Sequence, residues 1–196
     1  MYNSKMSENA TPGAAERLLD TAARLFYTRG VSNVGINEII ARAGVARMTL
    51  YHHFASKDAL IRAVLERRQK ERDAWLRQVD QLAEDPTERL LAVFDLFLEW
   101  ARAPDFRGCP LVAATFELGG QLNAARPYAQ THQATTRQYL TRCADEAGLR
   151  EPEAIATQLQ MLLEGASVLT LVSGNSEAAA LAKNAAASLI VGARDD

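Results

Sequence analysis

Cysteine is scarce in this chain of 196 residues, which contains only Cys109 and Cys143. The two are far apart in sequence, with no CxxC spacing and no neighbouring histidine, so we expect reduced thiols rather than disulfides. No apolar run approaches the roughly 18 residues that a membrane-spanning helix needs. The first residues, MYNSKMSENATPG, lack the apolar segment of a secretory signal. These absences predict a cytoplasmic protein with its own hydrophobic core.

The motifs of common enzymes are also missing. The sequence has no nucleophile elbow, phosphate-binding loop, dinucleotide glycine pattern or zinc-ligand spacing. His52 and His53 are adjacent, but neighbouring side chains on a helix point about 100° apart, and no carboxylate or cysteine lies four residues from both. We therefore expect no enzymatic activity, no cofactor and no metal site.

The net charge of −2 conceals two regions of opposite sign. Residues 1–72 carry 12 Lys and Arg against 7 Asp and Glu, a net charge of +5. Residues 73–196 carry 10 against 17, a net charge of −7. A basic first third on an acidic body suggests a polyanionic partner for the first third alone.

Apolar residues recur with helical spacing almost throughout, and no alternating strand pattern is convincing. The fold class is therefore all-α, with about nine helices. Helix-capping residues mark several boundaries: Thr11 before Pro12, Ser56, and Asp85 before Pro86, with Gly30 as a stop. The expected helices cover about residues 12–29, 36–43, 46–54, 57–82, 86–103, 110–118, 125–147, 152–172 and 176–193.

Two short helices joined by Ala43-Gly44-Val45, behind a longer one, have the layout of a helix-turn-helix. Small residues at the turn let the two helices meet at a steep angle. In the second short helix, Leu50 and Phe54 share the face that we expect to point into the core. The other faces are then free to enter the major groove of DNA.

The exposed residues of that helix have side chains suited to reading DNA. Arg47 can pair with guanine O6 and N7, and Met48 can lie against a thymine methyl group. Thr49 and Tyr51 offer hydroxyl groups to phosphates, and His52 can contact a base or a phosphate. These five residues are the predicted recognition surface.

The stretch AGVARMTLYHHFASKDALIRAV resembles the signature of the TetR family of repressors (TetR/AcrR type), supported upstream by LLDTAARLFYTRG and INEII. The resemblance implies that Asn37 is a further DNA contact and that Lys57, which begins the fourth helix, is a phosphate clamp. One departure is that Val34-Gly35 stands where the family usually has Thr or Ser as a helix cap. Either Gly35 caps weakly or Asn33 supplies the side chain.

The resemblance also sets the expected domain organisation. Residues 1–11 form a flexible arm, and residues 12–60 form the DNA-binding domain, with a linker helix to about 82. Residues 61–196 form a ligand-binding and dimerisation domain. The family pairs its last two helices with those of a second copy, and the alanine-rich end of this chain suits such packing. The partners expected are palindromic double-stranded DNA, a second copy and a small organic effector.

The effector cavity is expected among the bulky aromatics of the acidic body, which favours a neutral or cationic ligand. Aromatics at these positions are first of all candidates for the core, and only the family resemblance makes them candidates for a cavity. Two alternatives stay open: a DNA-binding regulator with no small-molecule effector, and an enzyme or carrier on the same fold. The candidate lining residues are Phe94, Phe97, Trp100, Cys109, Phe116, Glu117, Tyr128, His132, Gln160 and Met161.

Overall fold

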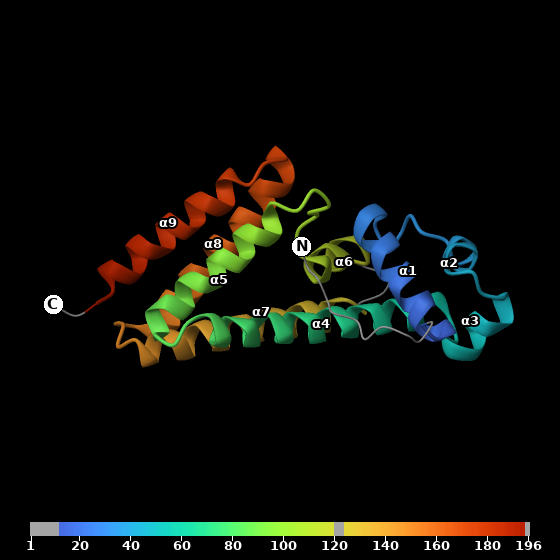
Figure 1. The fold of residues 1–196 in the computed structure, drawn as a ribbon, viewed down its shortest axis with the longest axis horizontal. Coiled ribbons are helices and arrows are strands. Elements are labelled where there is room, and N and C mark those ends of the chain that lie inside the picture. The colour runs from blue at the N-terminus through green and yellow to red at the C-terminus, as the bar shows by residue number, and fades with distance from the viewer. Residues whose placement is uncertain (1–11, 120–123, 195–196) are drawn as a thin grey trace. The chain divides into compact units, whose positions relative to one another are not determined.

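The computed structural model describes residues 12–119 and 124–194 (Figure 1). The predicted arm at residues 1–11, with its capping Thr11, lies outside the described residues. In the described ranges the regular elements are helices joined by turns and loops, with one isolated antiparallel bridge between Leu149 and Arg194. The all-α prediction is confirmed. The helices are α1 (Ala14–Arg29), α2 (Ile36–Ala43), α3 (Arg47–His53), α4 (Lys57–Leu82), α5 (Pro86–Ala101), α6 (Pro110–Glu117), α7 (Arg126–Glu146), α8 (Pro152–Ser173) and α9 (Glu177–Gly192).

Local capping chemistry explains most of these boundaries. The Ser56 hydroxyl accepts a hydrogen bond from the Ala59 amide, and the Asp85 carboxylate accepts one from the Glu88 amide. Gly30, at φ 85°, ends α1 as predicted. The start of α1 differs from the prediction, because Gly13 rather than Thr11 is its N-cap and Pro12 precedes the helix.

The described chain separates into two compact units, Met1–Val64 and Leu65–Asp196. In the first unit, α1 contacts both α2 and α3. Apolar side chains from the three helices and from the start of α4 are buried between them. The core of this unit contains Leu18, Ala22, Leu25, Phe26, Val34, Ile39, Leu50, Leu60 and Val64.

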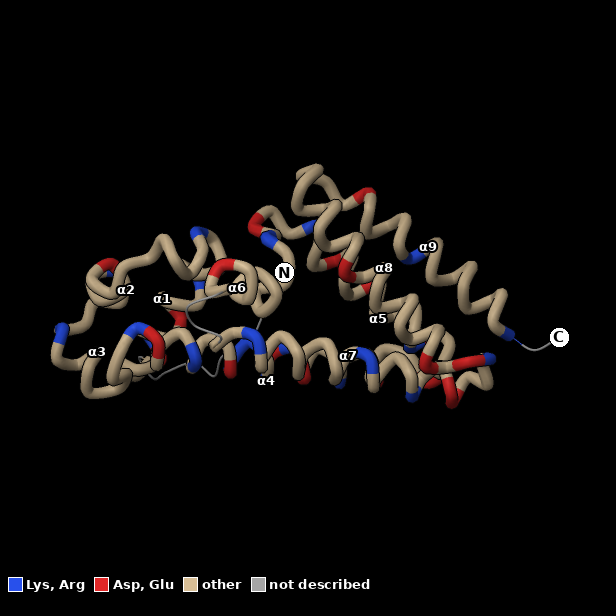
Figure 2. The backbone as a smooth tube through the Cα atoms, turned by 180° about the vertical axis from the view of Figure 1, so that it is seen from behind, with Lys and Arg blue, Asp and Glu red and all other residues tan. Residues whose placement is uncertain are grey.

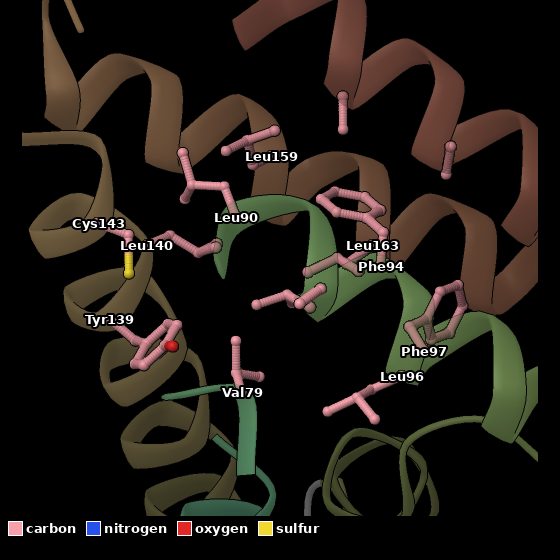
Figure 3. Packing of buried hydrophobic residues seen from close by; sticks show 14 of the residues in the cluster. Val79, Leu90, Phe94, Leu96, Phe97, Tyr139, Leu140, Cys143, Leu159 and Leu163 are labelled. Carbon is pink, nitrogen blue, oxygen red and sulfur yellow. The ribbon is translucent and has the colours of Figure 1, made fainter. Parts of the chain in front are cut away.

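The second unit is a helical bundle in which α8 packs on α7, α9 and α5. Its core is one contiguous apolar cluster, to which the C-terminal half of α4 contributes Trp75, Leu76 and Val79 (Figure 3). Hydrogen bonds close one end of the bundle: the Tyr139 hydroxyl donates to Asp80 at 2.8 Å, and Arg89 pairs with Glu146 at 3.3 Å. These polar contacts join α4, α5 and α7.

Helix α8 is long and apolar enough, by length and composition, to cross a membrane, with a mean hydropathy of 1.4 over its most apolar window. The sequence analysis expected no such segment. The structure gives another reason for this composition: one side of α8 faces the core, while Val168, Leu169 and Val172 are exposed on the other. One apolar helix with two apolar sides is weak evidence for a membrane span.

We predict that Gly44→Ala destabilises the protein by about 1–2 kcal/mol, because φ at this position is +62° and a Cβ strains the left-handed region. No atom lies within 4 Å of the added Cβ, so the backbone alone carries the effect. Gly44→Asn should cost less, since asparagine tolerates this region. Urea denaturation measures the difference. Gly13→Ala, at φ −56° in open space, is the control, and equal stability of the two alanine variants contradicts the prediction.

Candidate functional site

The predicted turn between α2 and α3 is present, and Gly44 takes the left-handed conformation there. The Val45 amide donates to the Ile40 carbonyl at 3.3 Å, which closes the end of α2. From α1, the Arg17 Nε donates to the Ala43 carbonyl at 3.3 Å. The end of α2, and so the start of α3, is therefore fixed to α1.

Helix α3 has one fully buried side chain, Leu50, and that burial decides which residues face outward. Arg47, Met48, Tyr51 and His52 are exposed. The Arg47 guanidinium lies over the Tyr51 ring, 5.8 Å from its centroid, so this i,i+4 pair occupies one face. Such a face presents a planar cation, an aromatic hydroxyl and a thioether to a partner.

Three further predicted contact residues differ in how exposed they are and in whether they already form a hydrogen bond within the protein. Asn37 is exposed on α2, whereas Thr49 is half-buried on α3. The Lys57 ammonium donates to the Val31 carbonyl at 2.8 Å, so one of its three protons is engaged within the protein. The remaining two can still reach a phosphate.

The end of α3 and the start of α2 each have a distinct local structure. His53 is exposed, with its ring 6.5 Å from that of Phe54. It follows Leu50 by three residues, but α3 ends at His53, so no further turn covers it. At the start of α2, Gly35 is the N-cap without a side-chain bond, and the Asn33 amide donates instead to Arg29.

The predicted pocket residues separate into four groups in the second unit: core aromatics, half-buried residues, exposed residues and buried polar residues. Phe94 and Phe97 are packed within the apolar core (Figure 3). Trp100 is half-buried, with its ring 4.8 Å from that of Phe106. Tyr128 and Cys109 are also half-buried.

Phe116, Glu117 and Met161 do not line the interior. Phe116 is 82% exposed and Met161 is 68% exposed. Helix α6 buries Leu111 and Ala114, and the helical period turns Phe116 and Glu117 away from that side. Helix α8 likewise buries Leu159 and Leu163, which leaves Met161 on the opposite side.

Polar groups do lie within the bundle. Gln160 is buried, and its amide donates to the Gln133 carbonyl at 3.1 Å. His132 is also buried, and burial lowers its pKa to about 4, with a smaller contribution from the charge of Arg72. Burial raises the pKa of the Cys109 thiol, which argues against a reactive thiolate.

The sequence analysis missed Arg72 and Glu164, which belong to this polar interior. Arg72 lies in the segment RRQKERD of α4, in which every residue is polar. Burial lowers the pKa of Arg72 to about 10 and raises the pKa of the Glu164 carboxyl. The signal that could have found Arg72 is Trp75, one turn later in an otherwise polar segment.

Outward-facing apolar residues gather on α8 and α9, where few charged residues occur (Figure 2). On α8 they recur at helical spacing, and α9 adds two more. The exposed set is Met161, Val168, Leu169, Leu171, Val172, Leu181 and Val191. Isolated apolar residues on a surface are common, but a set along two adjacent helices indicates a contact surface.

A surface groove of about 700 Å³ lies along the outer side of α7 and the start of α8. Its lining includes Arg137, Arg142, Asp145 and Glu153. None of the predicted pocket residues lines it. It is therefore distinct from the interior considered above.

The sequence model of bacterial regulatory proteins of the tetR family matches residues 18–64. A model of the tetracyclin repressor-like C-terminal domain matches residues 86–186. The regulator LmrA of Bacillus subtilis is 30% identical over 172 residues, covering 82% of this chain and 88% of that protein.

A second relative and two solved structures extend the comparison. An uncharacterized HTH-type regulator of Mycobacterium tuberculosis is 38% identical over 99 residues, and the match spans about half of each protein, 50% of this chain and 48% of the relative. A TetR-family regulator from Streptomyces coelicolor has a TM-score of 0.88 at 27% identity, covering 93% and 96% of the two chains. A regulator from Streptomyces avermitilis described as a putative TetR-type protein has a TM-score of 0.80 at 30% identity, covering 93% and 98%.

We predict that stability falls at acid pH partly through His132. The folded protein holds its pKa near 4, while the unfolded chain binds a proton below about 6.5, so the stabilisation present above 6.5 is lost as pH falls towards 4. Between pH 7 and 4.5, His132→Gln should reduce this loss by about 2–3 kcal/mol. Urea denaturation at each pH measures it. Arg72, the charged group that acts on His132, is unchanged in both proteins. Parallel pH profiles refute the assignment.

Proposed function

Because the chain belongs to the TetR family of bacterial regulatory proteins, we propose that it is a cytoplasmic, homodimeric repressor. It binds a palindromic DNA site through α3 and releases the site when a small organic molecule binds the second unit. The observation that carries the proposal is the outward face of α3, fixed by the buried Leu50. Selection of bound sequences from random DNA tests it directly, and recovery of a palindrome is the expected result.

The first unit has the exposed helix and the positive net charge that binding to duplex DNA requires. Arg47, Met48, Tyr51 and His52 are exposed on a short helix whose start is fixed by the Gly44 turn. Such a helix reads base edges with its side chains, while nearby lysine and backbone amides contact phosphates. The net charge of +5 over residues 1–72 favours the same partner.

Dimerisation explains the apolar outer surface of α8 and α9. A twofold axis through these helices would bring Leu169 and Leu181 of each copy against the partner. Leu163 and Ala182, on the same two helices, are buried within one copy and cannot form the contact. A dimer with this symmetry matches a palindromic site whose half-sites lie about 34–36 Å apart.

A response to a small molecule follows from the polar interior of the second unit. Buried polar groups are normally hydrogen-bonded, yet His132 Nδ1 and Thr136 Oγ1 have no partner within the described ranges. A ligand that satisfies them would favour one conformation of the bundle. Since α4 belongs to both units, such a population shift could reach the first unit, which binds DNA in this proposal. By linkage, bound DNA would then weaken ligand binding.

A regulator without an effector is the second candidate, and the packing of Phe94 and Phe97 in the apolar core favours it. A protein that binds its palindrome but whose melting temperature responds to no compound would support this candidate.

We predict that Arg47→Ala weakens binding to the selected site by about 1–3 kcal/mol and relaxes the preference at one base pair. The reason is loss of a bidentate contact to guanine, which phosphate contacts do not replace. Fluorescence anisotropy on the cognate site and on single-base variants measures both effects. Arg24→Ala removes the same charge from an exposed position on α1 and should leave base preference intact. Unchanged preference after Arg47→Ala excludes it as a base reader.

We predict that Leu169→Arg, or Leu181→Arg, shifts the protein from dimer to monomer, because each places a charge in an apolar interface. Leu169 is 60% exposed and Leu181 is 59% exposed in one copy, so the isolated fold should tolerate the change. Sedimentation velocity at micromolar concentration gives the mass. Leu82→Arg, at a leucine 56% exposed at the end of α4, is the matched control. A wild-type protein that sediments as a monomer rejects the dimer.

A further inference from the structure

Arg72 is an interior cation whose position no local ion pair explains. Its guanidinium carbon lies 3.8 Å from the centre of the Trp75 ring, one turn later on α4. Within residues 12–119 and 124–194, no carboxylate forms an ion pair with Arg72, and its buried Nε has no hydrogen-bond partner. The side chain is nonetheless half-buried rather than fully enclosed. Stacking on an indole holds the guanidinium in place but leaves its in-plane donors unused.

Other elements of the second unit bring polar groups near this cation. The charge of Arg72 shifts the pKa of Cys109 at the start of α6, of His132 on α7 and of Glu164 on α8. These groups belong to three elements besides the helix of Arg72, and each interacts electrostatically with its guanidinium. Thr136 lies one turn beyond His132 on the buried side of α7.

The unpaired atoms in this region are suited to an acceptor. His132 and Thr136 are more than nine-tenths buried, and neither the Nδ1 of the first nor the Oγ1 of the second has a partner within the described chain. Thr136 can donate through its hydroxyl, and His132 can donate from Nδ1 in the corresponding tautomer. Together with Arg72 Nε, these atoms are three potential donors without a hydrogen-bond partner in the described chain, and an oxygen-rich anion could accept from them.

Glu164 is the one internal acid of α8 that could serve as the counter-ion. Burial raises the pKa of its carboxyl, although Arg72 opposes this effect. A carboxyl group held towards its neutral form compensates a cation poorly. No ion pair joins it to Arg72 among the described residues. A bound anion would satisfy Arg72 without requiring Glu164 to ionise.

We propose that Arg72 binds the carboxylate of an amphiphilic organic acid, with His132 and Thr136 as further donors to that carboxylate. The apolar part of the acid packs against the half-buried Trp100, which lies against the same apolar cluster as Trp75. The inference rests on the proposed function, since it takes the second unit to be the effector-binding part. It differs from the charge-based expectation of a neutral or cationic ligand, because a cation beside Arg72 would be repelled.

The test uses three carboxylates of different shape: octanoate, phenylacetate and cyclohexanecarboxylate. Each is compared with its matched primary alcohol and amine by thermal melting and by calorimetric titration of the full chain. At least one carboxylate should bind, and its alcohol and amine should bind at least tenfold more weakly. Failure of all three carboxylates, or equal binding of a carboxylate and its alcohol, overturns the proposal.

Variants locate the site. Arg72→Gln should weaken carboxylate binding at least tenfold, and Arg72→Lys should retain part of the affinity. Arg77→Gln, the same change at an exposed arginine of α4, should alter binding less than twofold. Glu164→Gln provides a readout that does not depend on the folding of Arg72→Gln, because an amide cannot carry a negative charge that would repel the bound carboxylate, so binding should be as tight or tighter. Unaltered binding by folded Arg72→Gln, or weaker binding by Glu164→Gln, overturns the assignment.

DNA binding is measured separately on the selected palindrome. A carboxylate that binds through Arg72 but leaves DNA affinity unchanged supports this inference and rejects ligand-triggered release. If the protein selects no DNA sequence, the proposed function is rejected. The carboxylate site is still tested independently, by the binding measurements on the variants of Arg72.

Discussion

The second unit depends on a single constraint, which is that α8 is apolar on two opposite sides. Its inner side, with Leu159 and Leu163, packs on α5, α7 and α9 and holds the bundle together. Its outer side carries Val168 and Leu169, which one copy of the chain leaves in solvent. Because apolar area exposed to water is unfavourable, the helix that forms part of the core also has an outer side whose burial against a partner is favourable.

Polar groups in the interior, unlike apolar side chains, lose favourable hydration when they are buried. Removing a guanidinium from water is costly unless hydrogen bonds or an opposite charge replace the lost hydration. Around Arg72 the bundle supplies an indole face and several polar neighbours but no ion pair in the described chain. Full satisfaction of these groups would favour a well-packed, closed bundle, whereas incomplete satisfaction leaves a place that an acceptor can fill.

Local chemistry made the helix boundaries predictable. Ser56 and Asp85 accept amide hydrogen bonds at helix starts, and Gly44 takes the left-handed turn that other residues avoid, so each boundary is determined by a few neighbouring residues. For the same reason the sequence predicted which side of α3 is exposed, because burial of Leu50 defines it. The sequence did not predict which apolar side chains of the second unit face outward, since Phe116 and Met161 lie on the outer sides of their helices.

The sequence by itself determined the all-α fold, the nine described helices, the turn at Gly44 and the basic character of the first unit, because periodicity, capping and charge act within a few residues. The tertiary structure alone decided which apolar residues of α8 and α9 face solvent and which polar side chains share the interior. Arg72, Cys109, His132 and Glu164 lie on four separate elements and converge only when the helices pack. Which side of a helix is buried depends on its neighbours, and a one-dimensional pattern does not contain them.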